Sequence, residues 1–348
     1  MLHAIGSADI ESMTHRLPLV KLSLLRPFAS ELRERGIDPE PVFESVGLIE
    51  EVTLDPDLSV HVMVATQFIE NAAVVANDSF LGAHVGSKLD LGGWPVLADA
   101  EARANTVGDY LSIFIARANE IASSATEYLN ITGQVAVFGE TRTFEPTILP
   151  AQNDAFMVAL GWAILRRALR DEVDPSRVTV VVCDPSALPP EFDLMHPVKG
   201  DRMGFSIRFP SAWLSASFET ISTGVAPKER LDATVGEFVH SFRQVVRAHI
   251  GQGALSAAEC AALASMSQQK LKRRLAAEGT SISNEIGFVR QEYARAALAE
   301  TNRSISDIAT ALGFTDVANF TRAFRRANDM TPTACRKLQK TEDDDSTG

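Results

Sequence analysis

Two short segments near the C-terminal end of the chain carry polar side chains at spacings that suit the recognition of nucleic-acid bases. In the first segment, Leu271 and Leu275 lie four residues apart and predict the inward face of a helix. The side chains that this helix turns outward are Gln268, Gln269, Lys272 and Arg273. In the second segment Phe320 and Phe324 repeat the spacing, and the side chains off this apolar stripe are Thr321, Arg322 and Arg325. Amide, ammonium and guanidinium groups on an exposed helix can hydrogen-bond to base edges in the major groove of DNA.

A short helix and a tight turn precede each of these segments. The residues with the spacing of helix N-terminal caps are Ser256 with Glu259 and Ser304 with Asp307. Gly313 suits the second turn because glycine tolerates a positive φ. A helix, a short turn and a helix with a polar outer face form the helix-turn-helix pattern. One copy is weak evidence, since helical hairpins are common, but the pattern recurs 48 residues later, from Ser267 to Thr315.

The distribution of charge separates this region from the rest of the chain. The whole chain has a formal net charge of -12, whereas residues 253–340 hold 13 Lys and Arg against 8 Asp and Glu. An acidic body with a basic C-terminal segment suggests that only this segment meets a polyanion. The alternative for each basic residue is a solvated helix face, which is the usual role of a surface charge.

The pattern of elements changes near residue 222. Apolar spacing predicts amphipathic helices at 60–77 and 106–124, and alternation around Gly133 predicts two strands joined by a turn. A helix with an Asn or Asp cap is predicted over 153–173, and the apolar run 178–183 predicts a buried strand. Every segment from about residue 234 to 338 is predicted to be helical.

These patterns predict an α+β N-terminal domain followed by an all-α C-terminal domain with two helix-turn-helix motifs. The expected divisions are a flexible N-terminus at 1–18, an α+β domain at 19–222, a linker at 223–233, a tandem helix-turn-helix domain at 234–338 and an acidic disordered tail at 339–348.

The C-terminal residues resemble a known family. The run Ala-x-x-Leu-Gly-Phe at 309–314, then Phe320, Arg322, Phe324 and Arg325, then Thr-Pro-x-x-x-Arg at 331–336 are similar to the C-terminal signature of AraC/XylS-type transcriptional regulators. Residues 266–281 are similar to that family's first recognition helix. The resemblance covers about residues 232–338. It implies a seven-helix unit whose two recognition helices enter successive major grooves on one side of the duplex.

The resemblance completes a set of expected DNA contacts. The expected base-contacting residues are Gln268, Gln269, Lys272, Arg273, Val317, Ala318, Thr321 and Arg322. Val317 and Ala318 stand where the family often has polar residues, so we expect methyl contacts there. The expected phosphate-contacting residues are Ser267, Lys270, Thr315, Arg325 and Arg326. Arg274 is expected either at this surface or at the back of its helix.

The N-terminal part is similar to a subgroup of the same family. Residues 79–111 resemble the arabinose-binding-type domain of a subgroup that includes ornithine-responsive and virulence regulators. The resemblance rests on the order of elements more than on a motif. It implies a domain that senses an effector and forms dimers, and it does not make arabinose the ligand. The sequence identifies no effector-binding residue.

Other chemistry finds little support in the sequence. Cys183 ends a strand and could be a nucleophile, but no His stands in a recognisable partner motif, so we expect a small core residue. The seven histidines have no metal-ligand spacing, and we expect no metal and no cofactor. The three tryptophans, Trp94, Trp162 and Trp213, could line a pocket, although core packing is the default.

We therefore interpret the chain as a cytoplasmic, non-enzymatic transcription regulator that binds specific promoter DNA and a small-molecule effector of unknown identity. No apolar run approaches the roughly 18–20 residues that a membrane span needs. RNA polymerase and a second copy of the chain are further candidate partners. Two alternatives remain open: an enzyme with incidental DNA-binding helices, and an architectural DNA-binding protein without an effector.

Overall fold

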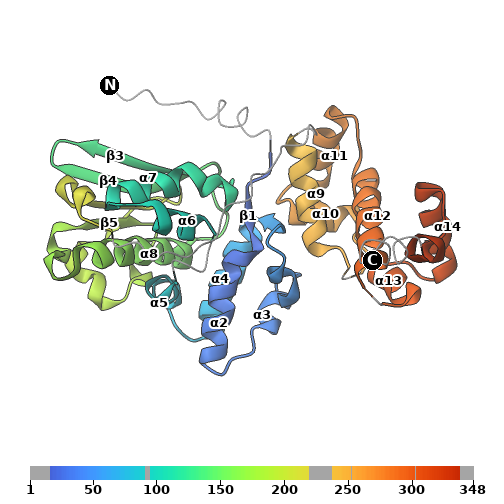
Figure 1. Ribbon diagram of the computed structural model, residues 1–348, viewed down its shortest axis with the longest axis horizontal. Helices are drawn as coiled ribbons and strands as arrows, with labels where there is room; N and C mark the ends of the chain where they lie inside the picture. Colours follow the sequence, from blue (N-terminus) through green and yellow to red (C-terminus); the bar gives the residue numbers. More distant parts are fainter. Residues whose placement is uncertain (1–15, 91–94, 219–236, 252, 302, 338–348) are drawn as a thin grey trace, which may run out of the picture. The chain divides into compact units, whose positions relative to one another are not determined.

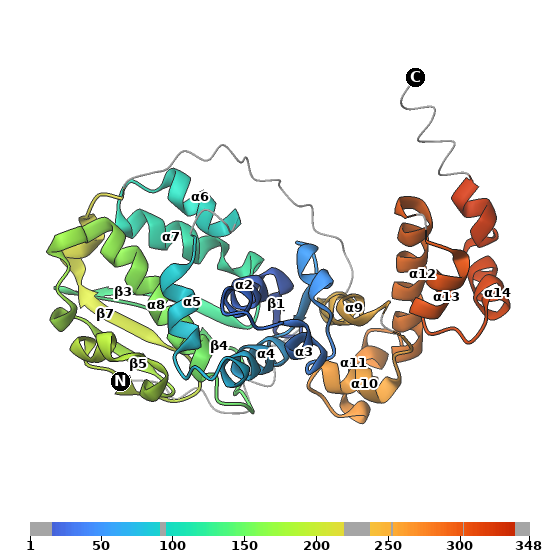
Figure 2. The ribbon, with the colours of Figure 1, turned by 90° about the horizontal axis from the view of Figure 1, so that it is seen from below.

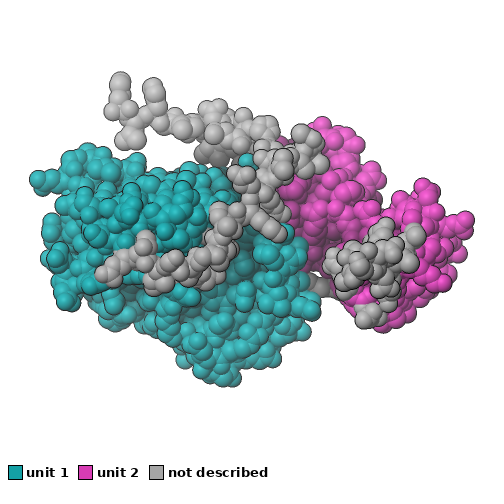
Figure 3. Space-filling model, in the orientation of Figure 1, with its two compact units in different colours: residues 1–233 teal, residues 234–348 magenta. Residues whose placement is uncertain are grey.

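The chain folds into two compact units, residues 1–233 (unit 1) and residues 234–348 (unit 2), which are coloured separately in Figure 3. The computed structural model describes residues 16–90, 95–218, 237–251, 253–301 and 303–337. The expected linker at 223–233 and the expected tail at 339–348 lie outside the described residues. Residues 1–15 of the expected N-terminal segment also lie outside them, while Leu17 is buried in unit 1.

Unit 1 mixes helices and strands (Figure 1). Its elements are β1 (Leu19–Lys21), α2 (Arg26–Glu34), α3 (Glu40–Glu44), β2 (Ser59–His61), α4 (Val62–Val75), α5 (Leu81–Lys88), α6 (Pro95–Arg103), α7 (Val107–Arg117), β3 (Ala125–Thr132), β4 (Val135–Arg142), α8 (Ala151–Leu169), β5 (Thr179–Val182), β6 (Val198–Lys199) and β7 (Ser206–Pro210). Short 3-10 helices occupy several of the connections.

A five-stranded sheet forms one layer of unit 1, in the order β3-β4-β7-β5-β6. The pairs β3–β4, β4–β7 and β5–β7 are antiparallel, and β6 joins the edge of β5 in parallel. The hairpin of β3 and β4 turns at Gly133, which has φ +58, as the alternation in the sequence predicts. Its register pairs Glu127 with Glu140.

Helix α8 lies against this sheet, and α5 lies against α8. At Gly161 of α8 an added Cβ would come within 2.5 Å of Ile207 on β7, so the helix backbone approaches the sheet closely. At Gly82 and Gly86 of α5, four residues apart, an added Cβ would meet the backbone of α8 at 2.0 and 2.3 Å. Glycine at these positions lets two helix backbones meet where any side chain would separate them. Figure 2 shows α5 and α8 side by side.

Three details of unit 1 differ from the sequence-based expectation. Residues 19–21 pair with residues 59–61 in a two-stranded sheet, β1–β2, so the start of the predicted 60–77 helix is a strand instead. Helix α7 ends at Arg117, before the end of the predicted 106–124 segment. Helix α8 begins at Ala151 with no side-chain cap from Asn153 or Asp154; instead the carboxylate of Glu70 accepts a hydrogen bond from the Gln152 N–H at 2.8 Å.

Unit 2 is helical throughout its described residues. Its helices are α9 (Glu237–His249), α10 (Ala257–Leu263), α11 (Gln268–Ala277), α12 (Ile282–Glu300), α13 (Ile305–Ala311) and α14 (Val317–Asn328), and residues 332–337 are also helical. The expected fold class, α+β followed by all-α with two helix-turn-helix motifs, is confirmed. None of the helices within the described residues is both long enough and apolar enough to cross a membrane.

The long helix α12 connects the two hairpins α10–α11 and α13–α14 and contacts members of both (Figures 1 and 2). Ion pairs from Arg243 to Glu285 and from Arg247 to Glu292 join α9 to α12. The capping boxes predicted at Ser256 and Ser304 are both present, which fixes the start of the first helix in each hairpin.

Candidate functional site

Helix α11 separates an apolar inner face from a polar outer face. Ser267 caps its N-terminus, because its hydroxyl accepts a hydrogen bond from the Lys270 N–H at 3.2 Å. Leu271 and Leu275 are fully buried. The outer side chains Gln268, Gln269, Lys272 and Arg273 are all exposed. The helix therefore presents four side chains that can form hydrogen bonds on the face opposite its buried leucines.

Helix α14 has the same construction with different outer residues. Asp316 caps it by accepting a hydrogen bond from the Asn319 N–H at 2.7 Å. Phe320 and Phe324 are buried, and Phe314 from the preceding turn lies against Phe320 with ring centroids 5.4 Å apart. Outside this core, Val317, Ala318 and Arg322 are exposed and Thr321 is half-buried.

The expected base-contacting residues occupy equivalent positions on the two helices. Gln268 and Val317 each follow the cap residue directly, and the other pairs stand in the same register from their caps. The four pairs are Gln268 with Val317, Gln269 with Ala318, Lys272 with Thr321 and Arg273 with Arg322. Residues at these positions lie on one side of a helix, because its repeat is about 3.6 residues. Each helix thus offers one compact outer surface.

Around these surfaces lie the residues expected to meet phosphates. Lys270, Arg325 and Arg326 are exposed, as are Ser267 and Thr315 at the starts of the two helices. Arg274 behaves differently: its guanidinium lies over the ring of Phe238, 4.8 Å from the centroid. Of the two positions expected for Arg274, the back of the helix is therefore the observed one.

One residue near this surface was not predicted. Asn319 lies between Asp316 and Arg322, and its amide bonds to both side chains. The chain of contacts holds the Arg322 guanidinium at the N-terminal half of α14. The spacing of Asp316, Asn319 and Arg322, three residues apart, is the signal that could have revealed it, since such residues are neighbours on a helix.

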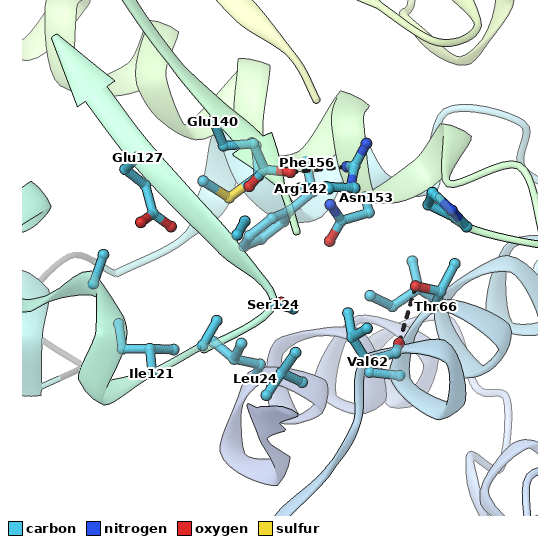
Figure 4. A pocket seen from close by; sticks show the side chains of 18 of the residues that line it. Leu24, Val62, Thr66, Ile121, Ser124, Glu127, Glu140, Arg142, Asn153 and Phe156 are labelled. Carbon is cyan, nitrogen blue, oxygen red and sulfur yellow. Dashed lines mark hydrogen bonds and ion pairs between the residues drawn. The ribbon is translucent and has the colours of Figure 1, made fainter. Parts of the chain in front are cut away.

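Unit 1 contains a cavity of about 100 Å³ between its N-terminal helices, the β3–β4 hairpin and α8 (Figure 4). Its wall is mainly apolar, with Leu24, Val62, Ile69, Phe114, Phe156 and Leu160 among the lining residues. Four polar side chains, which we call the polar group of the cavity, face the same space: Glu127, Glu140, Arg142 and Asn153. An apolar cavity with a few convergent polar groups is the usual form of a small-molecule site.

The polar group is tied to the core by ion pairs. The Arg142 guanidinium lies 2.9 Å from a carboxylate oxygen of Glu140 and also pairs with Asp154. Asp154 is fully buried and accepts a further hydrogen bond from the Cys183 N–H at 2.9 Å. Burial raises the pKa of the Glu140 carboxyl to about 7; Arg142 opposes this shift, and Asp154 and Glu127 add to it.

The residues considered for other chemistry lie in the core or outside the described residues. Cys183 is buried, and burial raises the pKa of its thiol, so the thiolate that a nucleophile requires is disfavoured. Trp162 and Trp213 are buried away from the cavity lining, and Trp94 lies outside the described residues. Across the described residues, no group of three or more His, Cys, Asp or Glu is placed to hold a metal ion.

Comparison with known proteins assigns both units. The helix-turn-helix domain family matches residues 260–338. The family described as the N-terminal arabinose-binding domain of AraC transcription regulators matches residues 36–218, more than half of the chain. The chain belongs to the AraC family of transcription regulators. The expected resemblance is thereby confirmed, with a helix-turn-helix domain after an N-terminal domain of the AraC effector-binding type.

Individual relatives are more distant. The transcriptional activator NphR from Rhodococcus sp is 26% identical over 134 residues, which are 38% of this chain and 40% of NphR. The chain therefore aligns with less than half of that activator. Among solved structures, the transcriptional regulator CdpR from Pseudomonas aeruginosa is 18% identical, with 90% of this chain and 98% of that chain covered and a TM-score of 0.40. An AraC-type regulator from Chromobacterium violaceum is 26% identical over 29% of this chain and 90% of its own, with a TM-score of 0.27.

Proposed function

We propose that this AraC-family chain binds specific promoter DNA by placing α11 and α14 in successive major grooves, and that unit 1 adjusts this binding in response to a small molecule. The observation that carries the proposal is the shared geometry of the two helices. Each has a capped N-terminus, a buried pair of apolar residues and an exposed outer surface at equivalent positions. A major groove is wide enough to admit one such helix.

Helix α11 supplies the more specific reading in this proposal. The side-chain amides of Gln268 and Gln269 can each form two hydrogen bonds with adenine, one through the amide oxygen and one through the amide nitrogen. The guanidinium of Arg273 can donate two hydrogen bonds to guanine. Lys272 adds a charged donor beside them. These exposed side chains reach base edges only if the N-terminal half of α11 points into the groove, which is the usual docking of a recognition helix.

Helix α14 reads with fewer polar groups. Val317 and Ala318 present methyl groups, which suit contact with the methyl group of thymine. Arg322, held by Asn319, supplies the polar contact, and half-buried Thr321 lies beside it. We therefore assign the second groove to apolar contacts around one positioned arginine.

Affinity comes largely from phosphates in this proposal. Lys270, Arg325 and Arg326 flank the outer surfaces of α11 and α14 and contact phosphates in this proposal, so they do not distinguish one base from another. Ser267 and Thr315 lie at the starts of the two helices, where the DNA backbone passes. Phosphate neutralisation releases counterions and makes binding fall with salt. The acidic remainder of the chain limits attraction elsewhere, so that DNA meets unit 2 at its basic surface.

Unit 1 supplies regulation through its cavity. The space is lined by segments of α4, α7, α8 and the β3–β4 hairpin, so a ligand inside it would contact several elements at once. Nothing in unit 1 is assigned a catalytic role in this proposal. Assignment to the ornithine and virulence subgroup, location in the cytoplasm, contact with RNA polymerase and formation of a homodimer remain predictions of the sequence.

The test is a hydroxyl-radical footprint of the full-length protein on DNA upstream of its own gene and of neighbouring genes. We expect two protected patches on one side of the duplex, with centres one helical turn apart, about 10 base pairs. A titration at several salt concentrations should give a log affinity that falls linearly with log salt. A single protected patch would overturn two-groove reading, and equal binding to random DNA would overturn sequence specificity.

A further inference from the structure

The polar group of the cavity in unit 1 contains two carboxylates on neighbouring strands. Glu127 on β3 and Glu140 on β4 are direct partners in the antiparallel register, so their side chains leave the hairpin on the same face. Both line the cavity (Figure 4). Like charges directly opposite on a sheet destabilise it, and burial strengthens the repulsion. The fold thus maintains a costly arrangement that faces the cavity.

The described residues supply too little positive charge for this arrangement. Arg142 is the cationic side chain among the described lining residues, and it is shared between Glu140 and Asp154. Across the described parts of the chain, no Lys or Arg forms an ion pair with Glu127. One guanidinium therefore faces three carboxylates, and the Glu127 carboxylate on β3, which bonds to its own backbone N–H, has no cationic partner among the described residues.

The raised pKa values of the two hairpin carboxyls agree with a deficit of positive charge around them. Burial raises the pKa of Glu127, and it raises the pKa of Glu140 to about 7. The titratable groups that act on Glu140 are Arg142 on β4, Asp154 on α8 and Tyr128 on β3. The buried Cys183 thiol and Glu70 on α4, whose pKa burial raises to about 7, interact in turn with Asp154. Because the pKa of Glu140 lies near 7, a cation bound beside this carboxyl would favour its ionised form and release a proton at neutral pH.

We propose that the cavity binds a small molecule with an apolar body and one cationic nitrogen, whose charge lies between Glu127 and Glu140. The inference rests on the proposed effector role of unit 1 and names the chemical class of that effector. A cavity of about 100 Å³ has the same order of size as the roughly 150 Å³ that holds benzene, and it is open on one side, so the apolar body is no larger than a single ring or a short chain. Phe114, Phe156 and Leu160 contact that body, while the hairpin carboxylates accept hydrogen bonds from the ammonium.

The test compares three probes of one shape and different charge: benzylamine, benzyl alcohol and benzoate. Each is titrated into the full-length protein at neutral pH, with calorimetry for affinity and thermal unfolding for stabilisation. We expect benzylamine to bind at least ~10-fold more tightly than benzyl alcohol, as for a charge-assisted hydrogen bond, and benzoate to bind least. Titration in buffers of different ionisation enthalpy should show that benzylamine releases protons on binding.

Three variants locate the effect. Glu127→Gln and Glu140→Gln should each remove most of the preference for benzylamine over benzyl alcohol, and Glu140→Gln should reduce the proton release. Glu191→Gln, an equal charge change at an exposed position of the 3-10 helix Pro190–Met195, is the matched control and should leave both quantities unchanged. Because Glu127 is only half-buried, its variant keeps the test decisive even if Glu140→Gln unfolds.

Two kinds of result overturn the proposal. The first is benzyl alcohol or benzoate binding as tightly as benzylamine, or no binding of any probe up to its solubility limit. The second is an unchanged preference in Glu127→Gln. Either result, combined with an intact two-patch footprint, would remove the cationic ligand while leaving DNA recognition standing; loss of the footprint would instead count against the proposed function.

Discussion

The two helix-turn-helix hairpins of unit 2 share their inner faces and differ in their turns and outer faces. Both begin with a capping box at Ser256 or Ser304, and both bury two apolar residues of the second helix. The first turn has Ser265 at φ +50 where the second has Gly313 at φ +76. The outer residues change from amides and charges on α11 to methyl groups and one arginine on α14. Packing thus fixes the inner positions, and the outer surface is free to serve recognition.

The largest difference between the hairpins should appear in the tolerance of their turns. An alanine at Gly313 would place Cβ 2.5 Å from the backbone of Ala254 and would hold an L-residue at positive φ. We expect Gly313→Ala to destabilise the protein by roughly 3 kcal/mol or more, because strain and overlap add. Calorimetric unfolding of the full-length protein measures this loss.

The matched change in the first turn is Ser265→Ala. Ser265 already holds an L-residue at positive φ, so the substitution leaves the backbone strain unchanged and removes the hydroxyl with its contacts, and we expect a change within about 1 kcal/mol. If the two substitutions had equal effects, close packing at Gly313 would not distinguish the hairpins.

The second prediction separates the outer surfaces. We expect Arg273→Ala and Arg322→Ala each to weaken binding to the specific site by about 1–3 kcal/mol and to relax base preference at one half-site only. Binding measurements on DNA with single base changes in either half-site provide the readout. Arg274→Ala serves as a control, since that side chain lies over Phe238, and its loss should not change base preference. An equal loss on specific and random DNA would show that Arg273 and Arg322 contact phosphates.

Interactions between residues close together in the sequence could be predicted, whereas interactions between distant residues could not. Helix starts at Ser256 and Ser304 followed from cap spacing, because a cap involves residues only three apart. The start of α8 did not, because its acceptor comes from Glu70, far along the chain. The β1–β2 sheet was missed for the same reason, since its strands are short and distant in sequence.

The candidate sites follow the same division. The outer residues of α11 and α14 could be predicted, because helical periodicity alone separates them from Leu271 and Phe320. The cavity could not, because its lining combines segments that meet only after unit 1 has folded. Glu127 and Glu140 were within reach of the sequence: each stands six residues from the nearer residue of a two-residue turn at Gly133 and Gln134, which makes them hairpin partners.

The smallest expected effect concerns the turn of the first hairpin and returns to Ser265. An L-residue in the left-handed region raises the free energy of the folded protein by about 1–2 kcal/mol, and glycine removes that strain. Glycine also raises the entropy of the unfolded chain, which lowers the free energy of unfolding by about 0.4–1 kcal/mol. We therefore expect Ser265→Gly to be more stable than Ser265→Ala by roughly 0.5–1 kcal/mol. The comparison with alanine is essential, because both variants lose the serine hydroxyl and differ only in backbone freedom. Thermal unfolding should show the glycine variant melting about 4 °C above the alanine variant. Identical melting of the two variants would mean that the first turn relaxes without strain, and the two hairpins would then differ in their outer faces and in the packing at Gly313 alone.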